Sequence, residues 1–175
     1  MNKKEARAYA LNLRKKENNL TSSALAVSQI VSKKFLSSYN NIGIYYPIGK
    51  EIDITILVNE YKDKNFYLPI TREDGLHFVR YTKNQKLYDG PFKTKEPLGD
   101  YIDRDQIEVF LIPCVAITNE LKRIGYGKGY YDKYLAGYNG LKIGICYKDA
   151  ANLDVEMDEF DLVLDMMVLA WKLLQ

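Results

Sequence analysis

Three glycines and two cations lie close together in the segment KRIGYGKGYYDKYL, residues 122–135. They are Arg123, Gly125, Gly127, Lys128 and Gly129. Because glycine has no Cβ atom, backbone with this spacing can approach a ligand closely, and the flanking cations indicate an anion. The segment matches neither a P-loop nor the dinucleotide-binding fingerprint. The pattern alone is equally typical of a phosphate site and of a glycine turn before a helix.

Acidic and basic residues are also concentrated at two other places. The first sixteen residues carry six cations against one acid, Glu5, and residues 149–165 carry seven acids and no base. The six cations are Lys3, Lys4, Arg7, Arg14, Lys15 and Lys16. Such runs are most often solvated surface, and an acidic run becomes a metal site only when further oxygen ligands converge on it. Asp132 is one candidate, because it falls in the first turn of the helix expected after the glycines.

Strands alternating with helices are expected to position these residues. The most strand-like run is IEVFLIP (107–113), which is apolar on both faces and therefore predicted to be central in a parallel sheet. Hydrophobic periodicity and turn residues predict helices at 3–17, 22–37 (after a Thr21-Ser22 cap), 53–62 and 129–137, and strands at 41–47, 65–70, 76–81 and 141–147. Residues 82–105 form a polar stretch interrupted by glycine and proline. The alternation predicts a single three-layer α/β/α domain over residues 1–175 with a mostly parallel central sheet.

Composition limits the class of protein. The 175 residues are 47% hydrophobic and 27% charged, as in a soluble globular domain, and the net charge of +2 argues against a dedicated nucleic-acid binder. Cys114 and Cys146 lie in apolar runs and are expected to be buried thiols in a reducing compartment. The chain shows neither an apolar signal core nor an apolar run of 18 residues, so we expect a cytoplasmic protein that spans no membrane. We also expect a monomer.

Five segments, in order along nearly the whole chain, resemble the 5-formyltetrahydrofolate cyclo-ligase (methenyltetrahydrofolate synthetase) family. They are KKEAR, YYPIGKEIDITIL, EPLGD, IPCVAITNELKRIGYGKGYYDKYL and EMDEFDLVLD. The fourth is similar to the family's R-x-G-x-G-x-G-Y-Y-D stretch. Cys114 stands where the family usually has glycine, and Ile117-Thr118 replaces its frequent Phe-Asp.

The resemblance implies an enzyme that uses ATP and Mg²⁺ to close 5-formyltetrahydrofolate into 5,10-methenyltetrahydrofolate. By resemblance, the ATP-binding residues are Lys3, Lys4, Arg7, Arg123, Ile124, Gly125, Gly127, Lys128, Gly129, Tyr130 and Tyr131. The folate-binding residues would be Tyr46, Glu51, Tyr126, Gly127, Lys128, Gly129 and Tyr130. The metal ligands would be Asp132 and Asp161, and the catalytic residues Glu51, Arg123 and Lys128.

Other interpretations stay open at this point. The chain could be a nucleotide-binding regulatory domain with altered catalysis, or an RNA-binding module that uses the basic helix and the tyrosines. By position alone, Glu51 is typical of a first-turn acid stabilised by a helix dipole, and Arg14 of a solvated cation. The lone histidine, His77, lies in an apolar strand pattern and is expected to be structural.

Overall fold

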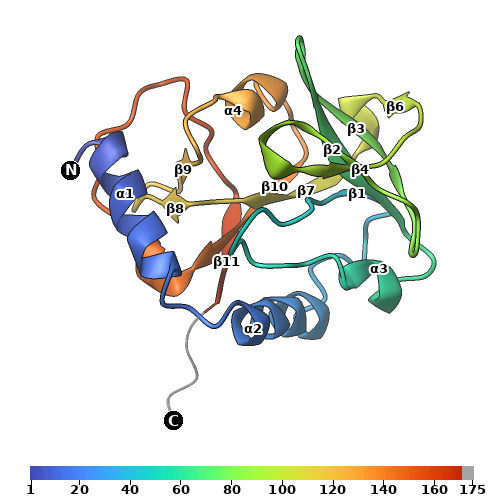
Figure 1. Cartoon of the computed structure of the whole chain (residues 1–175), viewed down its shortest axis with the longest axis horizontal. Helices are drawn as coiled ribbons and strands as arrows, with labels where there is room; N and C mark the ends of the chain where they lie inside the picture. Colours follow the sequence, from blue (N-terminus) through green and yellow to red (C-terminus); the bar gives the residue numbers. More distant parts are fainter. Residues whose placement is uncertain (171–175) are drawn as a thin grey trace.

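A seven-stranded sheet crosses the computed structural model, which describes residues 1–170 (Figure 1). The strand order is β11-β10-β7-β1-β2-β3-β6. Pairings from β11 through to β2 are parallel, and those of β2 with β3 and β3 with β6 are antiparallel. The strands are β1 (Asn41–Gly43), β2 (Asn65–Arg72), β3 (Gly75–Tyr81), β6 (Tyr101–Ile102), β7 (Val109–Pro113), β10 (Leu141–Tyr147) and β11 (Met166–Ala170). The predicted mostly parallel sheet is confirmed.

Helices cover both faces of this sheet, as a three-layer domain requires. They are α1 (Lys3–Arg14), α2 (Asn19–Ser32), α3 (Leu57–Glu60) and α4 (Tyr130–Tyr134). One apolar cluster joins α1 and α4 to the sheet around Phe110, and the other joins α2 and α3 to it around Ile42. In Figure 1, α2 and α3 lie below the sheet and α4 lies above it. The predicted α/β/α layering is therefore confirmed.

The central position of β7 follows from its sequence. All five of its residues are buried, and it pairs in parallel with β1 on one side and β10 on the other. A strand buried on both faces needs apolar side chains throughout, which is the pattern of residues 109–113. The predicted strands at 65–70, 76–81 and 141–147 are also present, as β2, β3 and β10.

The first two helices begin at asparagine caps. Asn2 and Glu5 form a capping box at the start of α1, and the Asn18 side chain accepts a hydrogen bond from the Thr21 N–H at the start of α2. The predicted cap at Thr21-Ser22 was wrong, because Asn18 already satisfies this N–H group. Both helices also end before the predicted boundaries, at Arg14 and Ser32.

The helix predicted over residues 53–62 is reduced to the four residues of α3. The Asp53 carboxylate accepts hydrogen bonds from the backbone N–H and the hydroxyl of Thr55, at 2.9 and 2.6 Å. This local turn competes with helical backbone, and β-branched residues at positions 54–56 also lower helix propensity. The helix predicted at 129–137 is similarly shortened to α4, followed by Gly137 at a φ of +75°.

Short elements complete the chain between the main strands. They are β4 (Tyr88–Asp89), β5 (Lys95–Glu96), β8 (Ala116–Ile117), β9 (Arg123–Ile124) and three 3₁₀ turns at Pro91–Lys93, Arg104–Gln106 and Lys148–Ala150. The pairs β4-β5 and β8-β9 form small antiparallel sheets of their own. The predicted burial of Cys114 and Cys146 is confirmed, and both thiols are free.

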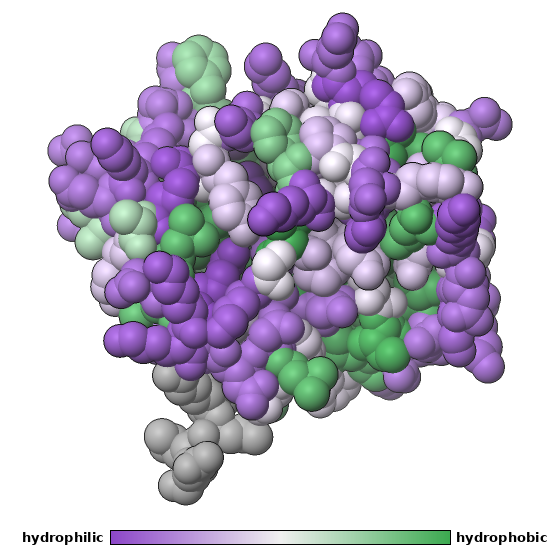
Figure 2. Space-filling view, in the orientation of Figure 1, coloured by the Kyte–Doolittle hydropathy of each residue, from purple (hydrophilic) through white to green (hydrophobic). Residues whose placement is uncertain are grey.

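Within residues 1–170, no helix is both long and apolar enough to cross a membrane. In the face drawn in Figure 2, hydrophilic residues cover most of the surface and hydrophobic residues form small groups among them.

Candidate active site

A cavity of about 610 Å³ opens beside the carboxyl ends of β1 and β7, where open parallel sheets usually bind ligands. Its lining comes from α1, the loop after β1, the strands β2 and β3, the hairpin β4-β5, the end of β7, the segment from Arg123 to Asp132, and the loop that carries Met157 and Asp161. All the predicted site residues line it except Lys4, which is exposed on α1. The fold therefore gathers residues separated by more than a hundred positions in the sequence.

The glycine segment forms one wall of this cavity. Gly127 and Gly129 have φ angles of +94° and +72°, in the left-handed region that strains residues with a Cβ atom. At Gly125 the constraint is space, because an added Cβ atom would lie 2.5 Å from the guanidinium of Arg123. The Nε of Arg7 donates to the carbonyl of Gly125 at 2.6 Å, which ties α1 to the segment. Each of the three glycines thus has a steric reason.

Cations from both ends of the chain face the cavity. Arg123 donates from Nε to the Pro113 carbonyl at 2.8 Å, and its guanidinium lies 4.7 Å from the centre of the Tyr131 ring. The Lys128 ammonium lies 5.3 Å from the centre of the Phe92 ring. Arg7 and Arg123 are held by hydrogen bonds and Lys128 is exposed, and together they provide positive charge for an anionic ligand such as a polyphosphate.

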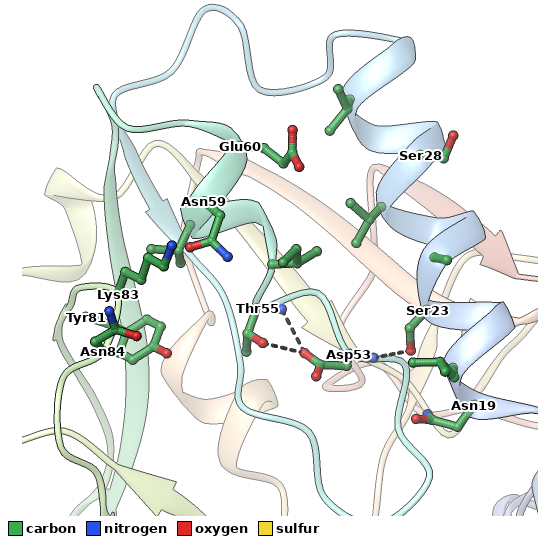
Figure 3. Close-up of a pocket in the computed structure, with 16 residues that line it drawn as sticks. Asn19, Ser23, Ser28, Asp53, Thr55, Asn59, Glu60, Tyr81, Lys83 and Asn84 are labelled. Carbon is green, nitrogen blue, oxygen red and sulfur yellow. Dashed lines mark hydrogen bonds between the residues drawn. The ribbon is translucent and has the colours of Figure 1, made fainter.

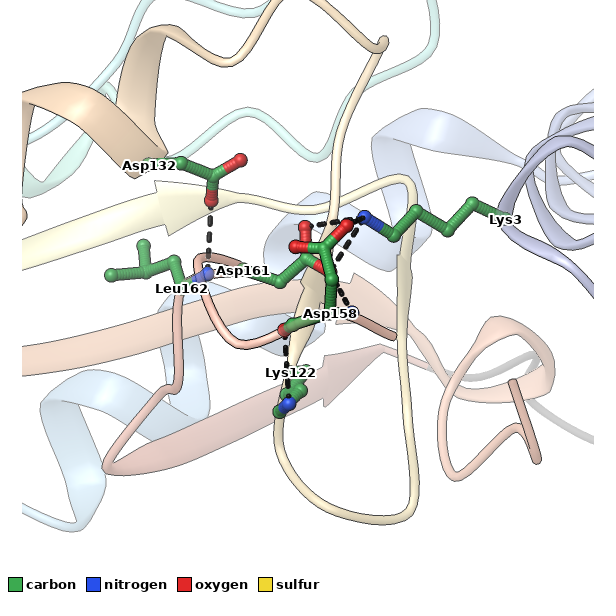
Figure 4. Close-up of polar contacts among 6 residues, drawn as sticks. All are labelled: Lys3, Lys122, Asp132, Asp158, Asp161 and Leu162. Carbon is green, nitrogen blue, oxygen red and sulfur yellow. Dashed lines mark hydrogen bonds and ion pairs between the residues drawn. The ribbon is translucent and has the colours of Figure 1, made fainter. Parts of the chain in front are cut away.

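The acidic residues have partners within the protein (Figure 4). The Lys3 ammonium lies 2.7 Å from a carboxylate oxygen of Asp158 and 2.6 Å from one of Asp161. The Asp132 carboxylate accepts a hydrogen bond from the N–H of Leu162 at 2.9 Å. Asp132 and Asp161 both line the cavity, and Figure 4 shows the Lys3 ammonium reaching the carboxylates of Asp158 and Asp161 from the same side.

These acids fit only a metal that takes few protein ligands. Among the residues that the structure describes, no three His, Cys, Asp or Glu side chains group closely enough to hold a metal ion. Mg²⁺ commonly takes one or two carboxylates and completes its coordination with water and substrate phosphates. Asp132 and Asp161 fit that role, with the Lys3 ammonium now beside Asp161.

Glu51 lines the cavity and is buried, with 4% of its surface exposed. It accepts a hydrogen bond from the Ile48 N–H at 2.8 Å. Desolvation raises the pKa of the Glu51 carboxyl to about 7, against the opposing effects of this hydrogen bond and of Arg14 and Arg123. No helix begins near Asp53, because α3 starts only at Leu57, so the positional interpretation of Glu51 as a first-turn acid stabilised by a helix dipole was wrong.

Hydrogen bonds with neighbouring elements hold the loop that carries Glu51. The Asn19 side chain donates to the carbonyl of Glu51 at 2.6 Å, and the Tyr147 hydroxyl donates to the carbonyl of Lys50 at 2.6 Å. The Lys50 ammonium in turn donates to the carbonyl of Lys15, just after α1. Glu51 is thus held in place through its backbone by α2, β10 and the end of α1.

Arg14 is buried, contrary to the expectation of a solvated cation. It is the last residue of α1, and 6% of its surface is exposed. It donates to the Tyr126 hydroxyl at 2.9 Å and to the Cys114 carbonyl at 3.2 Å. Periodicity could have indicated this, because Arg14 lies on the same helical face as the buried Ala6 and Ala10.

The wall formed by the hairpin β4-β5 was not predicted from the sequence. Phe92, Thr94 and Lys95 from this hairpin line the cavity. The hairpin is held to β2 by the buried Glu96, which accepts from the Thr71 N–H at 2.7 Å and lies 2.8 Å from Arg72. A buried glutamate within a polar stretch gives no periodic signal, so only its place in EPLGD indicated that it matters.

A second hollow, of about 720 Å³, lies between α2, α3 and the end of β3 (Figure 3). Among the described residues that line it, Lys83 is the one cation, against the acids Asp53 and Glu60. Figure 3 shows the Asp53 carboxylate turned toward Thr55, to which it is hydrogen-bonded. This hollow is larger but lacks convergent cations, so the cavity at the glycine segment is the candidate active site.

Comparison with known proteins gives the same family at each level. The model of the 5-formyltetrahydrofolate cyclo-ligase family matches residues 2–170. A 5-formyltetrahydrofolate cyclo-ligase of Mycoplasma pneumoniae is 30% identical over 73% of this chain and 71% of its own length.

Two solved structures share the fold. A 5,10-methenyltetrahydrofolate synthetase of Aquifex aeolicus is 29% identical with a TM-score of 0.83, over 96% of this chain and 89% of that one. Another synthetase of that kind, from Mycoplasma pneumoniae, is 26% identical with a TM-score of 0.74, over 96% of this chain and 98% of that one.

Proposed function

This chain belongs to the 5-formyltetrahydrofolate cyclo-ligase family, and on that basis we propose that it cyclises 5-formyltetrahydrofolate to 5,10-methenyltetrahydrofolate at the expense of ATP, with Mg²⁺ as cofactor. The observation that carries this proposal is the meeting of buried Glu51 with the cations Arg7, Arg123 and Lys128 around one cavity. A bare phosphate site would need the cations alone.

The proposed reaction solves a leaving-group problem. Nitrogen 10 of the folate can attack the formyl carbon, but the formyl oxygen would then have to depart as hydroxide. Transfer of the γ-phosphoryl group from ATP to that oxygen releases ADP. Attack by nitrogen 10 on the formyl carbon then forms the ring, expels phosphate and releases the proton of nitrogen 10. Phosphoryl transfer depends mainly on positioning and on neutralising charge.

We assign the ATP side of the cavity to α1 and the glycine segment. Arg7 and Arg123 are held by the carbonyls of Gly125 and Pro113, so their charges have fixed positions. Fixed cations stabilise the transferring phosphoryl group without reorganising during the step. Lys128, within the glycine segment, adds a third positive charge near the phosphates.

The folate side is assigned to Glu51, Tyr46 and Tyr126. With a pKa of about 7, the Glu51 carboxyl can carry its proton or lose it near neutral pH, and so can donate or accept a hydrogen bond with the pterin ring. The tyrosines offer flat faces for stacking. In this role Glu51 orients the formyl group toward the ATP side.

Asp132 and Asp161 are the residues that would hold Mg²⁺. When bound there, the metal would neutralise charge on the phosphates. For Asp161 to take part, its ion pair with Lys3 has to loosen, which frees the Lys3 ammonium to face the phosphates itself. The other interpretation, a nucleotide-binding domain with altered catalysis, would keep the cations but have no need of the buried Glu51.

The test is ATP-dependent growth of the near-ultraviolet absorption of methenyltetrahydrofolate with purified protein. We expect Arg123→Ala to weaken ATP binding by about 10- to 150-fold, the value of one charge-assisted hydrogen bond. Lys16→Ala is the control, because Lys16 is exposed near the end of α1 and lies outside the cavity. If ATP binds but no absorption grows, the regulatory interpretation holds instead.

A further inference from the structure

Two arginines of α1 contact successive residues of the glycine segment. Arg7 donates to the carbonyl of Gly125, and Arg14 donates to the hydroxyl of Tyr126. Seven residues are close to two turns of an α-helix, so both side chains leave the same face of α1. The helix therefore holds the segment at two points, one on the ATP side and one on the folate side of the cavity.

Arg14 is the more deeply buried of these two arginines. Arg14 is 6% exposed, its other hydrogen bond goes to the carbonyl of Cys114, and its guanidinium lies 5.8 Å from the centre of the Tyr147 ring. Burying a cation costs free energy of hydration unless hydrogen bonds and a neighbouring opposite charge compensate for it. Arg14 and the acid Glu51 line the same small pocket, together with Cys114 and Tyr147, and Arg14 lowers the pKa of the Glu51 carboxyl through space.

We propose that Arg14 is a positioning residue for the folate half of the cavity, which holds the hydroxyl of Tyr126 and stabilises the carboxylate form of Glu51. This inference rests on the proposed function, because it takes Tyr126 and Glu51 as the folate contacts. Arg14 itself does not line the cavity, so it acts through these two residues.

Two cations among the groups that face Glu51 stabilise its ionised carboxylate. Arg14 of α1 and Arg123 of β9 lower its pKa. The other titratable groups that interact with it are neutral near pH 7: Tyr45, Cys114, Tyr126 and Tyr131. Removal of Arg14 should therefore leave Arg123 as the single cation that favours the ionised carboxylate.

A ligand-free measurement tests the electrostatic part. The carboxyl carbons of ¹³C-labelled glutamate can be titrated by NMR, with Glu51 assigned through its absence in Glu51→Gln. We expect Arg14→Gln to raise the pKa of Glu51 above its wild-type value of about 7, because a nearby opposite charge is lost. Lys16→Gln, which removes an exposed cation just beyond α1, should leave it unchanged. An unchanged pKa in Arg14→Gln overturns the inference.

Kinetics test the positioning part. We expect Arg14→Gln to raise the KM for 5-formyltetrahydrofolate about tenfold while the KM for ATP stays within about twofold. Tyr126→Phe, which removes the same hydrogen bond without removing a charge, should raise the folate KM but leave the pKa of Glu51 near its wild-type value. Equal increases in both KM values would mean a general structural role and would overturn the inference.

The proposed function and this inference fail in different ways. Wild-type protein that makes no methenyltetrahydrofolate defeats the function, whereas the NMR titration still decides whether Arg14 acts on Glu51. If Arg14→Gln does not fold, Arg14→Lys keeps a charge near Glu51. That variant should then hold the pKa near 7 while the folate KM rises, and a shifted pKa with an unchanged KM would contradict the proposal.

Discussion

The buried carboxyl of Glu51 should make the stability of the ligand-free protein depend on pH. Its pKa is about 7 in the folded state, against an ordinary value of 4.5. The folded protein thus holds this proton more tightly than the unfolded chain does. The resulting stabilisation is fully present below about pH 4.5 and is lost as pH rises through 7. The difference between the two pKa values corresponds to on the order of 3 kcal/mol.

Glu51→Gln should remove this dependence. The amide oxygen can still accept the hydrogen bond from the Ile48 N–H, and the amide carries no charge at any pH. At pH 5 the variant and the wild type should therefore have similar free energies of unfolding. At pH 8 the variant should be the more stable, by up to about 3 kcal/mol, because it avoids burying a charge.

Urea unfolding at pH 5, 6, 7 and 8, without ligands, measures this difference directly. Because other titrating groups are common to both proteins, subtracting the wild-type curve from the variant curve leaves the contribution of Glu51. Glu60→Gln, at an exposed position on α3, is the matched control and should give a flat difference. A flat difference for Glu51→Gln as well would refute the burial argument and return its pKa to the ordinary range.

Two further predictions concern the metal and the sheet. Asp132→Asn should raise severalfold the Mg²⁺ concentration that gives half-maximal activity at saturating ATP. The amide keeps the hydrogen bond from the Leu162 N–H but loses the negative charge. An unchanged Mg²⁺ titration would place the metal elsewhere. Gly43→Ala should lower the free energy of unfolding, measured by urea titration, by about 1–3 kcal/mol. The reason is that the added Cβ atom would lie 2.3 Å from the buried ring of Phe110. A loss below about 0.5 kcal/mol would mean that the ring can move aside.

Local sequence determined the elements whose signals are periodic or strictly steric. The run 109–113 is apolar at every position, and only a strand covered on both faces needs that pattern, so its central place could be predicted. The backbone of the glycine segment could also be predicted, because glycines at this spacing usually mark left-handed backbone or a place where another group approaches the backbone closely. The family resemblance added the site residues, of which all but Lys4 line the cavity.

Tertiary structure alone decided the state of the charged side chains. Helical periodicity places Arg14 on the face of Ala6 and Ala10, but the partners that bury Arg14 and Glu51 come from segments far along the chain. Likewise, Lys3 meets Asp158 and Asp161 across more than 150 residues. The pKa of a group depends on desolvation and on charges within a few ångströms, and those neighbours are set by the packing of α1, the glycine segment and the sheet rather than by adjacent residues.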